Sequence, residues 1–152
     1  MIALRFAVLQ AYALWQGGFV FYAAAVVPIG TELLGSELAQ GLITQRVTHW
    51  LNLIGLAFHA IALWEAVVTT GCRRSRLALL SASLAGHAAL LILHASLDGL
   101  LVEGEISRAD RPHFRSLHVA YLWTSTGQWI LGMVWCGITL RAWRGKPGNL
   151  QN

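Results

Sequence analysis

The chain has 152 residues, of which 56% are hydrophobic and only 12% are charged, about half the charge of an ordinary soluble domain. This composition favours a membrane protein and leaves no room for a second folded domain. The formal net charge of +4 does not indicate a nucleic acid partner, because the basic residues lie between apolar runs instead of on one face of a soluble domain.

The first apolar run covers residues 6–29 and holds no charged residue. At about 1.5 Å per residue it is long enough to cross a hydrocarbon core of about 30 Å as a helix. Pro28 and Gly35 end this helix. The polar segment 31–48 that follows is expected outside the membrane, with a short interfacial helix over 36–45.

Three further apolar runs of membrane-spanning length follow, over residues 50–70, 77–102 and 117–140. The connection between the second and third spans is short, so these two helices are expected to be antiparallel neighbours. The sequence therefore predicts an all-α fold, an integral membrane four-helix bundle with antiparallel up-down topology. It forms one transmembrane domain over 1–152, in which 143–152 is a short cytoplasmic tail.

The distribution of charge among the connections predicts the orientation. One side of the membrane receives only basic residues, namely Arg5, Arg73, Arg74, Arg76, Arg141, Arg144 and Lys146. The other side receives both signs, namely Glu32, Glu37, Glu103, Glu105 and Asp110 together with Arg46, Arg108, Arg111 and Arg115. The positive-inside rule then places both termini in the cytoplasm. Short loops and small size suit a bacterial inner membrane.

Ionisable residues inside the apolar runs are the functional candidates, because such groups are costly in hydrocarbon unless they face the protein interior or find a partner. At about 100° per residue, polar side chains gather on one face of each of the last three helices. They are Asn52 and His59 on the second helix, Ser83, His87, His94 and Asp98 on the third, and His118, Tyr121, Ser125 and Gln128 on the fourth. We therefore expect a polar interior lined by histidine.

Glu65 lies on another face of the second helix. We expect this intramembrane acid to reach the cytoplasmic surface by extending its side chain, or to pair with Arg141.

Two interpretations place the histidines in contacts between helices in the interior of the bundle. The first is a structural network of interhelical hydrogen bonds, which holds a small bundle together. The second is b-type haem, whose axial ligands at equal depth would be His59 with His87, or His94 with His118.

Two more interpretations remain open beside these. One is a transition metal site formed by His94, Asp98 and His118 with His49, in which His94 and Asp98 have the i, i+4 spacing of a chelating pair. The other is a proton or ion path along the same polar groups.

Catalytic motifs do not occur in the sequence, which has no G-x-S-x-G, H-E-x-x-H, C-x-x-C, P-loop or dinucleotide fingerprint. Cys72 and Cys136 have neither metal-ligand nor disulfide-framework spacing. We therefore predict no catalytic residue.

Residues Trp15, Gln16, Gly17 and Gly18, with Phe21, Pro28 and the amphipathic stretch after it, resemble the opening of small four-helix membrane families related to copper-resistance protein D and of uncharacterised relatives. The resemblance covers residues 1 to about 50. It implies a four-helix bundle and, for the copper-linked branch, a histidine-dependent metal role for His94 and His118. The chain departs from a copper-transport pattern because it has no methionine-rich motif.

Together these observations predict a small multi-pass inner-membrane protein, a non-enzymatic subunit or accessory protein of a membrane assembly. Its partners would be the lipid bilayer and other membrane-protein subunits. The alternative is a haem b- or metal-binding redox protein that uses His59, His87, His94 and His118. A component of a proton or ion pathway is the third possibility.

Overall fold

The structure, a computed structural model, describes residues 1–101 and 106–144. All regular secondary structure among these residues is helical, which confirms the all-α prediction. The elements in chain order are α1 (Ile2–Phe21), the π-helical turn η1 (Tyr22–Val26), α2 (Val27–Leu34), α3 (Glu37–Val68), α4 (Arg73–Gly99) and α5 (Arg111–Arg144).

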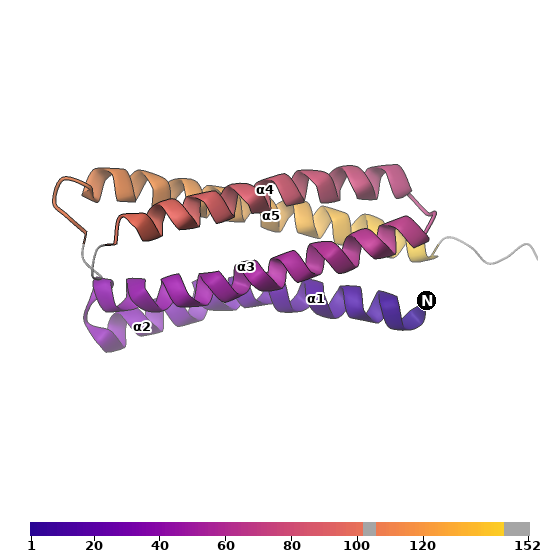
Figure 1. Ribbon diagram of the computed structural model, residues 1–152. Coiled ribbons are helices and arrows are strands. Elements are labelled where there is room, and N and C mark those ends of the chain that lie inside the picture. The colour runs from indigo at the N-terminus through magenta and orange to yellow at the C-terminus, as the bar shows by residue number, and fades with distance from the viewer. Residues whose placement is uncertain (102–105, 145–152) are drawn as a thin grey trace, which may run out of the picture.

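Four long helical segments lie side by side and alternate in direction (Figure 1). The continuous segment α1–η1–α2 packs along α3, α3 packs along α4, α4 packs along α5, and α5 also contacts α1. The N-terminus, the turn between α3 and α4, and the last turn of α5 lie at one end of the molecule, here called the terminal end (Figure 1). The opposite end carries α2 and the start of α5 and is called the loop end.

The first helical segment changes its winding just before Pro28. Proline has no backbone N–H and its ring collides with the carbonyl of the residue four positions earlier, so an undisturbed α-helix cannot run through it. The π-helical turn η1 absorbs this misfit, and Pro28 then stands in the first turn of α2. The segment therefore continues to Leu34, past the predicted end at residue 29.

The prediction of a separate interfacial helix over 36–45 is wrong. Gly35 ends α2 with φ of 58°, and the Ser36 hydroxyl immediately caps α3 by accepting a hydrogen bond from the Ala39 N–H at 3.2 Å. Nothing interrupts α3 from Glu37 to Val68, so the polar segment forms the first turns of the second long helix.

The remaining helices begin before their apolar runs, because a helix can extend through polar residues, whereas α3 ends at Val68 and α4 at Gly99, short of the predicted ends at 70 and 102. Helix α4 begins at Arg73 instead of residue 77, and α5 covers Arg111–Arg144 instead of 117–140. The predicted tail over 143–152 therefore starts inside α5, and its part from 145 onward lies outside the described residues, as does Val102 at the predicted end of the third span.

Three helical segments are long and apolar enough to cross a membrane, namely Ile2–Leu34, Ala39–Val68 and Arg73–Gly99. Large apolar side chains are exposed along all of the long helices, including Phe6 at 63%, Trp64 at 64%, Ile92 at 67% and Trp123 at 73%. A soluble protein rarely exposes apolar surface so continuously. The helices are thus apolar enough for a membrane protein.

Candidate functional site

The interior holds a cluster of polar side chains at mid-length, formed by Asn52, His59, Ser83, His87 and Gln128 and here called the histidine cluster. All five are at least nine-tenths buried. They come from α3, α4 and α5, the three helices on which the sequence predicts polar faces.

Hydrogen bonds fix the tautomer of each buried histidine. The Nδ1 atom of His59 lies 2.7 Å from the Gly55 carbonyl oxygen, which only accepts, so Nδ1 carries the proton. The neutral ring then accepts from the Ser83 hydroxyl at Nε2, over 2.9 Å. On the same reasoning, Nε2 of His87 donates to the Asn52 carbonyl at 3.0 Å. Gln128 joins α5 to α4 by donating from Nε2 to the Ser83 carbonyl at 2.6 Å.

Trp15 of α1 closes the histidine cluster from the remaining side. Its ring centroid lies 5.1 Å from that of His59 and 5.8 Å from that of His87, and the two imidazoles are 5.2 Å apart. Gly55 permits this approach, because a Cβ at this position would lie 2.5 Å from Cε1 of His87 and 2.6 Å from Nε1 of Trp15. The cluster is therefore packed by rings as well as joined by hydrogen bonds.

The arrangement bears on the haem hypothesis. An axial ligand must offer a free imidazole nitrogen to the iron. Both nitrogens of His59 and Nε2 of His87 are hydrogen-bonded within the protein, and among these four nitrogens only Nδ1 of His87 has no partner. The contacts therefore fit an interhelical network better than they fit His59 and His87 as a haem pair. Haem at His94 and His118 stays a prediction.

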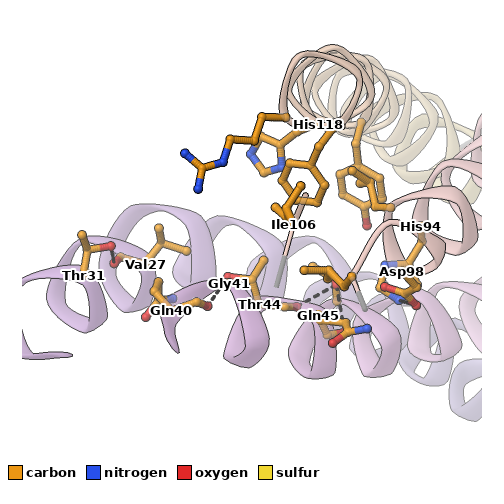
Figure 2. Close-up of a pocket in the computed structure, with 16 residues that line it drawn as sticks. Val27, Thr31, Gln40, Gly41, Thr44, Gln45, His94, Asp98, Ile106 and His118 are labelled. Carbon is orange, nitrogen blue, oxygen red and sulfur yellow. Dashed lines mark hydrogen bonds and ion pairs between the residues drawn. The ribbon is translucent and has the colours of Figure 1, made fainter. Parts of the chain in front are cut away.

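A pocket of about 880 Å³ lies at the loop end, between α2 and α3 on one side and α4 and α5 on the other. His94, Asp98 and Tyr121 line it together with His118, which faces Gln40 and Thr44 across the pocket (Figure 2). His94 and Asp98 form an i, i+4 pair with 3.4 Å between Nε2 and Oδ2. Three of the four predicted metal ligands thus share one pocket.

The predicted metal site is nevertheless not assembled. His49 is exposed and is absent from the pocket lining, although its ring lies 6.4 Å from that of His94. Over residues 1–101 and 106–144, no three His, Cys, Asp or Glu side chains gather closely enough to hold a metal ion. His118 is exposed and lines the pocket from α5, whereas the His94 and Asp98 pair lines it from α4.

Ser125, predicted for the polar interior, is half-buried and turns back to its own helix. Its hydroxyl donates to the Tyr121 carbonyl at 2.9 Å. Tyr121 itself is buried between the histidine cluster and the pocket, with its ring 6.4 Å from that of His94.

Glu65 is placed differently from the prediction. It is fully buried and forms an ion pair with Arg76, not with Arg141, and it does not reach the surface. Trp143 of α5 donates to the Glu65 carboxylate at 2.6 Å, and Arg76 donates from Nε to the Thr139 hydroxyl at 3.2 Å. We call Glu65, Arg76, Thr139 and Trp143 the ion-pair cluster.

Sequence reasoning misses Arg76 because α4 begins earlier than its apolar run. The run starts at residue 77, so Arg76 counts as a loop residue. In the structure it stands in the first turn of α4, directly across the α3–α4 turn from Glu65. The sequence does contain a signal for this pair. Glu65 and Arg76 lie on either side of a short antiparallel turn, and such a turn brings the residues that flank it together.

An apolar cluster separates the histidine cluster from the ion-pair cluster. Ala62 on α3, Leu80 on α4 and Trp135 on α5 lie between the two clusters along their helices, and the other buried members are Val8 and Trp15 on α1 with Phe58 and Ala66 on α3. Polar groups therefore extend from the loop-end pocket to mid-length and stop there. Among the described residues no continuous polar lining runs the whole length of the interior, and the proton or ion path stays a prediction.

No protein-family model, no curated protein and no solved structure matches the chain.

Proposed function

We propose that the chain is a four-helix inner-membrane bundle, with both termini in the cytoplasm, that serves as a non-enzymatic subunit or accessory protein of a membrane assembly. The observation that carries the proposal is the sorting of side chains. Large apolar residues cover the outside of the helices, whereas His59, His87, Glu65 and Arg76 are buried and paired inside. That arrangement suits lipid as the surrounding solvent.

Helix α5 has the least apolar composition of the four proposed spans, and its contacts support counting it as a membrane span. Residues 117–140 hold no Asp, Glu, Lys or Arg. Several of its polar residues form hydrogen bonds within the bundle: Gln128 donates to a carbonyl of α4, while Thr124, Ser125 and Thr126 donate to carbonyls of their own helix. Large apolar side chains, including Trp123 and Ile130, are exposed over this run, and the polar His118 is exposed near its loop end.

The non-enzymatic part of the proposal rests on the contacts of the buried polar residues, which connect helices to one another. The histidine cluster and the ion-pair cluster tie α3, α4 and α5 together, and Arg5 of α1 lies over the Trp143 ring at 5.3 Å. Each polar cluster thus connects helices, which is the work of a structural network. The exposed apolar faces leave room for neighbouring subunits.

Native gel electrophoresis of mildly solubilised membranes tests this proposal, with an absorbance spectrum of the purified protein beside it. We expect the chain to migrate in a complex of defined size and to show no Soret band in either the oxidised or the reduced form. Migration as a free monomer in every mild detergent would contradict the subunit role. A Soret band that His94→Leu or His118→Leu removes would establish the haem alternative.

A further inference from the structure

We propose that the loop-end pocket binds one phospholipid of the outer leaflet, with a zwitterionic head group that carries a primary ammonium and a phosphate. This inference rests on the proposed membrane placement, because it needs the pocket to lie at the level of the outer leaflet.

The pocket is accessible from the side of the bundle. Helix α2 contacts η1 and α3 and makes no contact with α4 or α5, so no helix pairing closes the bundle between α2 and α5 at this end. A molecule dissolved in the bilayer reaches such an opening without leaving the membrane. The volume of about 880 Å³ lies within the range of natural ligand pockets.

The walls combine apolar and polar surface, as an amphiphile requires. Leu97, Leu101, Ile106 and Phe114 supply apolar contacts for the glycerol and upper acyl region. The polar groups lie on both sides of them, with Thr44 on α3 and His118 on α5 facing each other across the space (Figure 2).

Helix α2 builds one wall of the pocket. Beyond η1, Val27 and Thr31 are four residues apart on α2, share one face, and both line the pocket. The turn is fastened to α3, since the Tyr22 hydroxyl donates to Thr44 at 2.9 Å and accepts from Gln40 at 3.3 Å. Such π-helical turns occur frequently at functional sites.

The charges that line the pocket select the head group. Asp98 on α4 and Arg111 at the start of α5 carry opposite signs, and His94 and His118 lie beside them. A purely anionic head group would satisfy Arg111 and leave Asp98 opposed to it. A head group with both charges matches both residues, with the ammonium donating to Asp98 and the phosphate accepting from Arg111.

Two residues of the pocket lining each carry a buried polar atom that has no hydrogen-bond partner. The Tyr121 hydroxyl is in a side chain only 6% exposed, and Oε1 of Gln40 is in one only 4% exposed. Both residues line the pocket, and neither atom has a hydrogen-bond partner among the residues that the structure describes. Buried polar atoms without partners are uncommon, because each one costs the free energy of its lost hydration. Both atoms are enclosed by protein in this structure, so either side chain must turn toward the pocket to bond a head group.

Native mass spectrometry of the full chain released from nanodiscs tests the proposal. The nanodiscs contain phosphatidylglycerol alone, or mixed equally with phosphatidylethanolamine or with phosphatidylcholine. We expect one retained phosphatidylethanolamine, bound about tenfold more tightly than phosphatidylcholine, whose quaternary ammonium has no N–H to donate to Asp98. Asp98→Asn should abolish this preference, and Arg111→Gln should weaken retention of both lipids about tenfold.

Matched controls are Glu32→Gln on α2 and Arg115→Gln on α5, two exposed charges at the same end that do not line the pocket. They should retain phosphatidylethanolamine as the unaltered chain does. Equal retention of all three lipids, retention of none, or equal losses in the controls would overturn the proposal. Near-ultraviolet circular dichroism establishes that each variant is folded. Failure of the membrane placement would appear separately, as release of the chain from membranes by alkaline carbonate.

Discussion

Replacing Arg76 with alanine is expected to lower the free energy of unfolding by about 3–5 kcal/mol, the range found when one partner of a buried ion pair is removed. The substitution leaves the Glu65 carboxylate fully buried with only the Trp143 indole as a donor. It also removes the bond to Thr139, which joins α4 to α5. Unfolding by increasing SDS in mixed micelles, followed by tryptophan fluorescence, measures the loss.

The neighbouring arginines provide the control. Arg73 and Arg74 stand in the same turn of α4 but are exposed, so Arg73→Ala and Arg74→Ala should each change stability by less than about 0.5 kcal/mol. The double variant Glu65→Leu/Arg76→Leu should recover most of the loss, because it removes both charges and keeps apolar volume. If Arg76→Ala costs no more than Arg73→Ala, the ion-pair cluster has no structural role.

Gly55→Ala is expected to cost about 1–3 kcal/mol, the usual penalty for forcing an extra carbon into a packed core. The new methyl group would meet His87 and Trp15 at once, and neither ring can move away freely. Trp15 is only 1% exposed and stacks on Phe58 with 5.1 Å between centroids, while His87 is held by its bond to the Asn52 carbonyl. The same SDS titration measures this change.

Two other helical glycines separate the packing effect from helix propensity. A Cβ at Gly17 or at Gly127 would meet nothing within 4 Å. Gly17→Ala and Gly127→Ala should therefore be neutral, or stabilising by up to about 1 kcal/mol. Gly55→Ala behaving like these two would show that the rings of the histidine cluster are not closely packed against α3.

Helical periodicity in the sequence predicts much of the buried interior of this fold. It predicts which polar residues share a face, and Asn52, His59, Ser83 and His87 lie buried together in the structure. Periodicity gives angles around one helix, however, and says nothing of the distance between two helices. That is why it groups His118 with Gln128, although His118 is exposed beside the pocket.

The positions at which the helices begin and end cannot be predicted from the apolar runs. An apolar run marks the residues suited to hydrocarbon, whereas a helix ends only where its backbone is capped or broken. Ser36 and Gly35 make such a boundary, and α3 therefore starts well before its apolar run. The same difference hides the partner of Glu65, because Arg76 precedes the apolar part of α4.

The proposed four-helix membrane bundle depends most on the number of membrane spans. Three helical segments meet the length and hydropathy expected of a span, and α5 is included on its contacts and its lack of charge over 117–140. With α5 in the membrane, Arg144 lies on the same side as Cys72 in the α3–α4 turn. Without it, the chain has three spans and Arg144 lies on the side of Ala109.

Labelling of single cysteines in intact cells with a membrane-impermeant maleimide decides between the two. Native Cys72 is tested in a chain with Cys136→Ser. Ala109→Cys and Arg144→Cys are each tested in a chain with Cys72→Ser and Cys136→Ser, and positions 72, 109 and 144 are exposed in the structure. Four spans with cytoplasmic termini predict that Ala109→Cys reacts in intact cells, while Cys72 and Arg144→Cys react only after permeabilisation. Reaction of Arg144→Cys in intact cells, with Cys72 still protected, would contradict the four-helix membrane bundle.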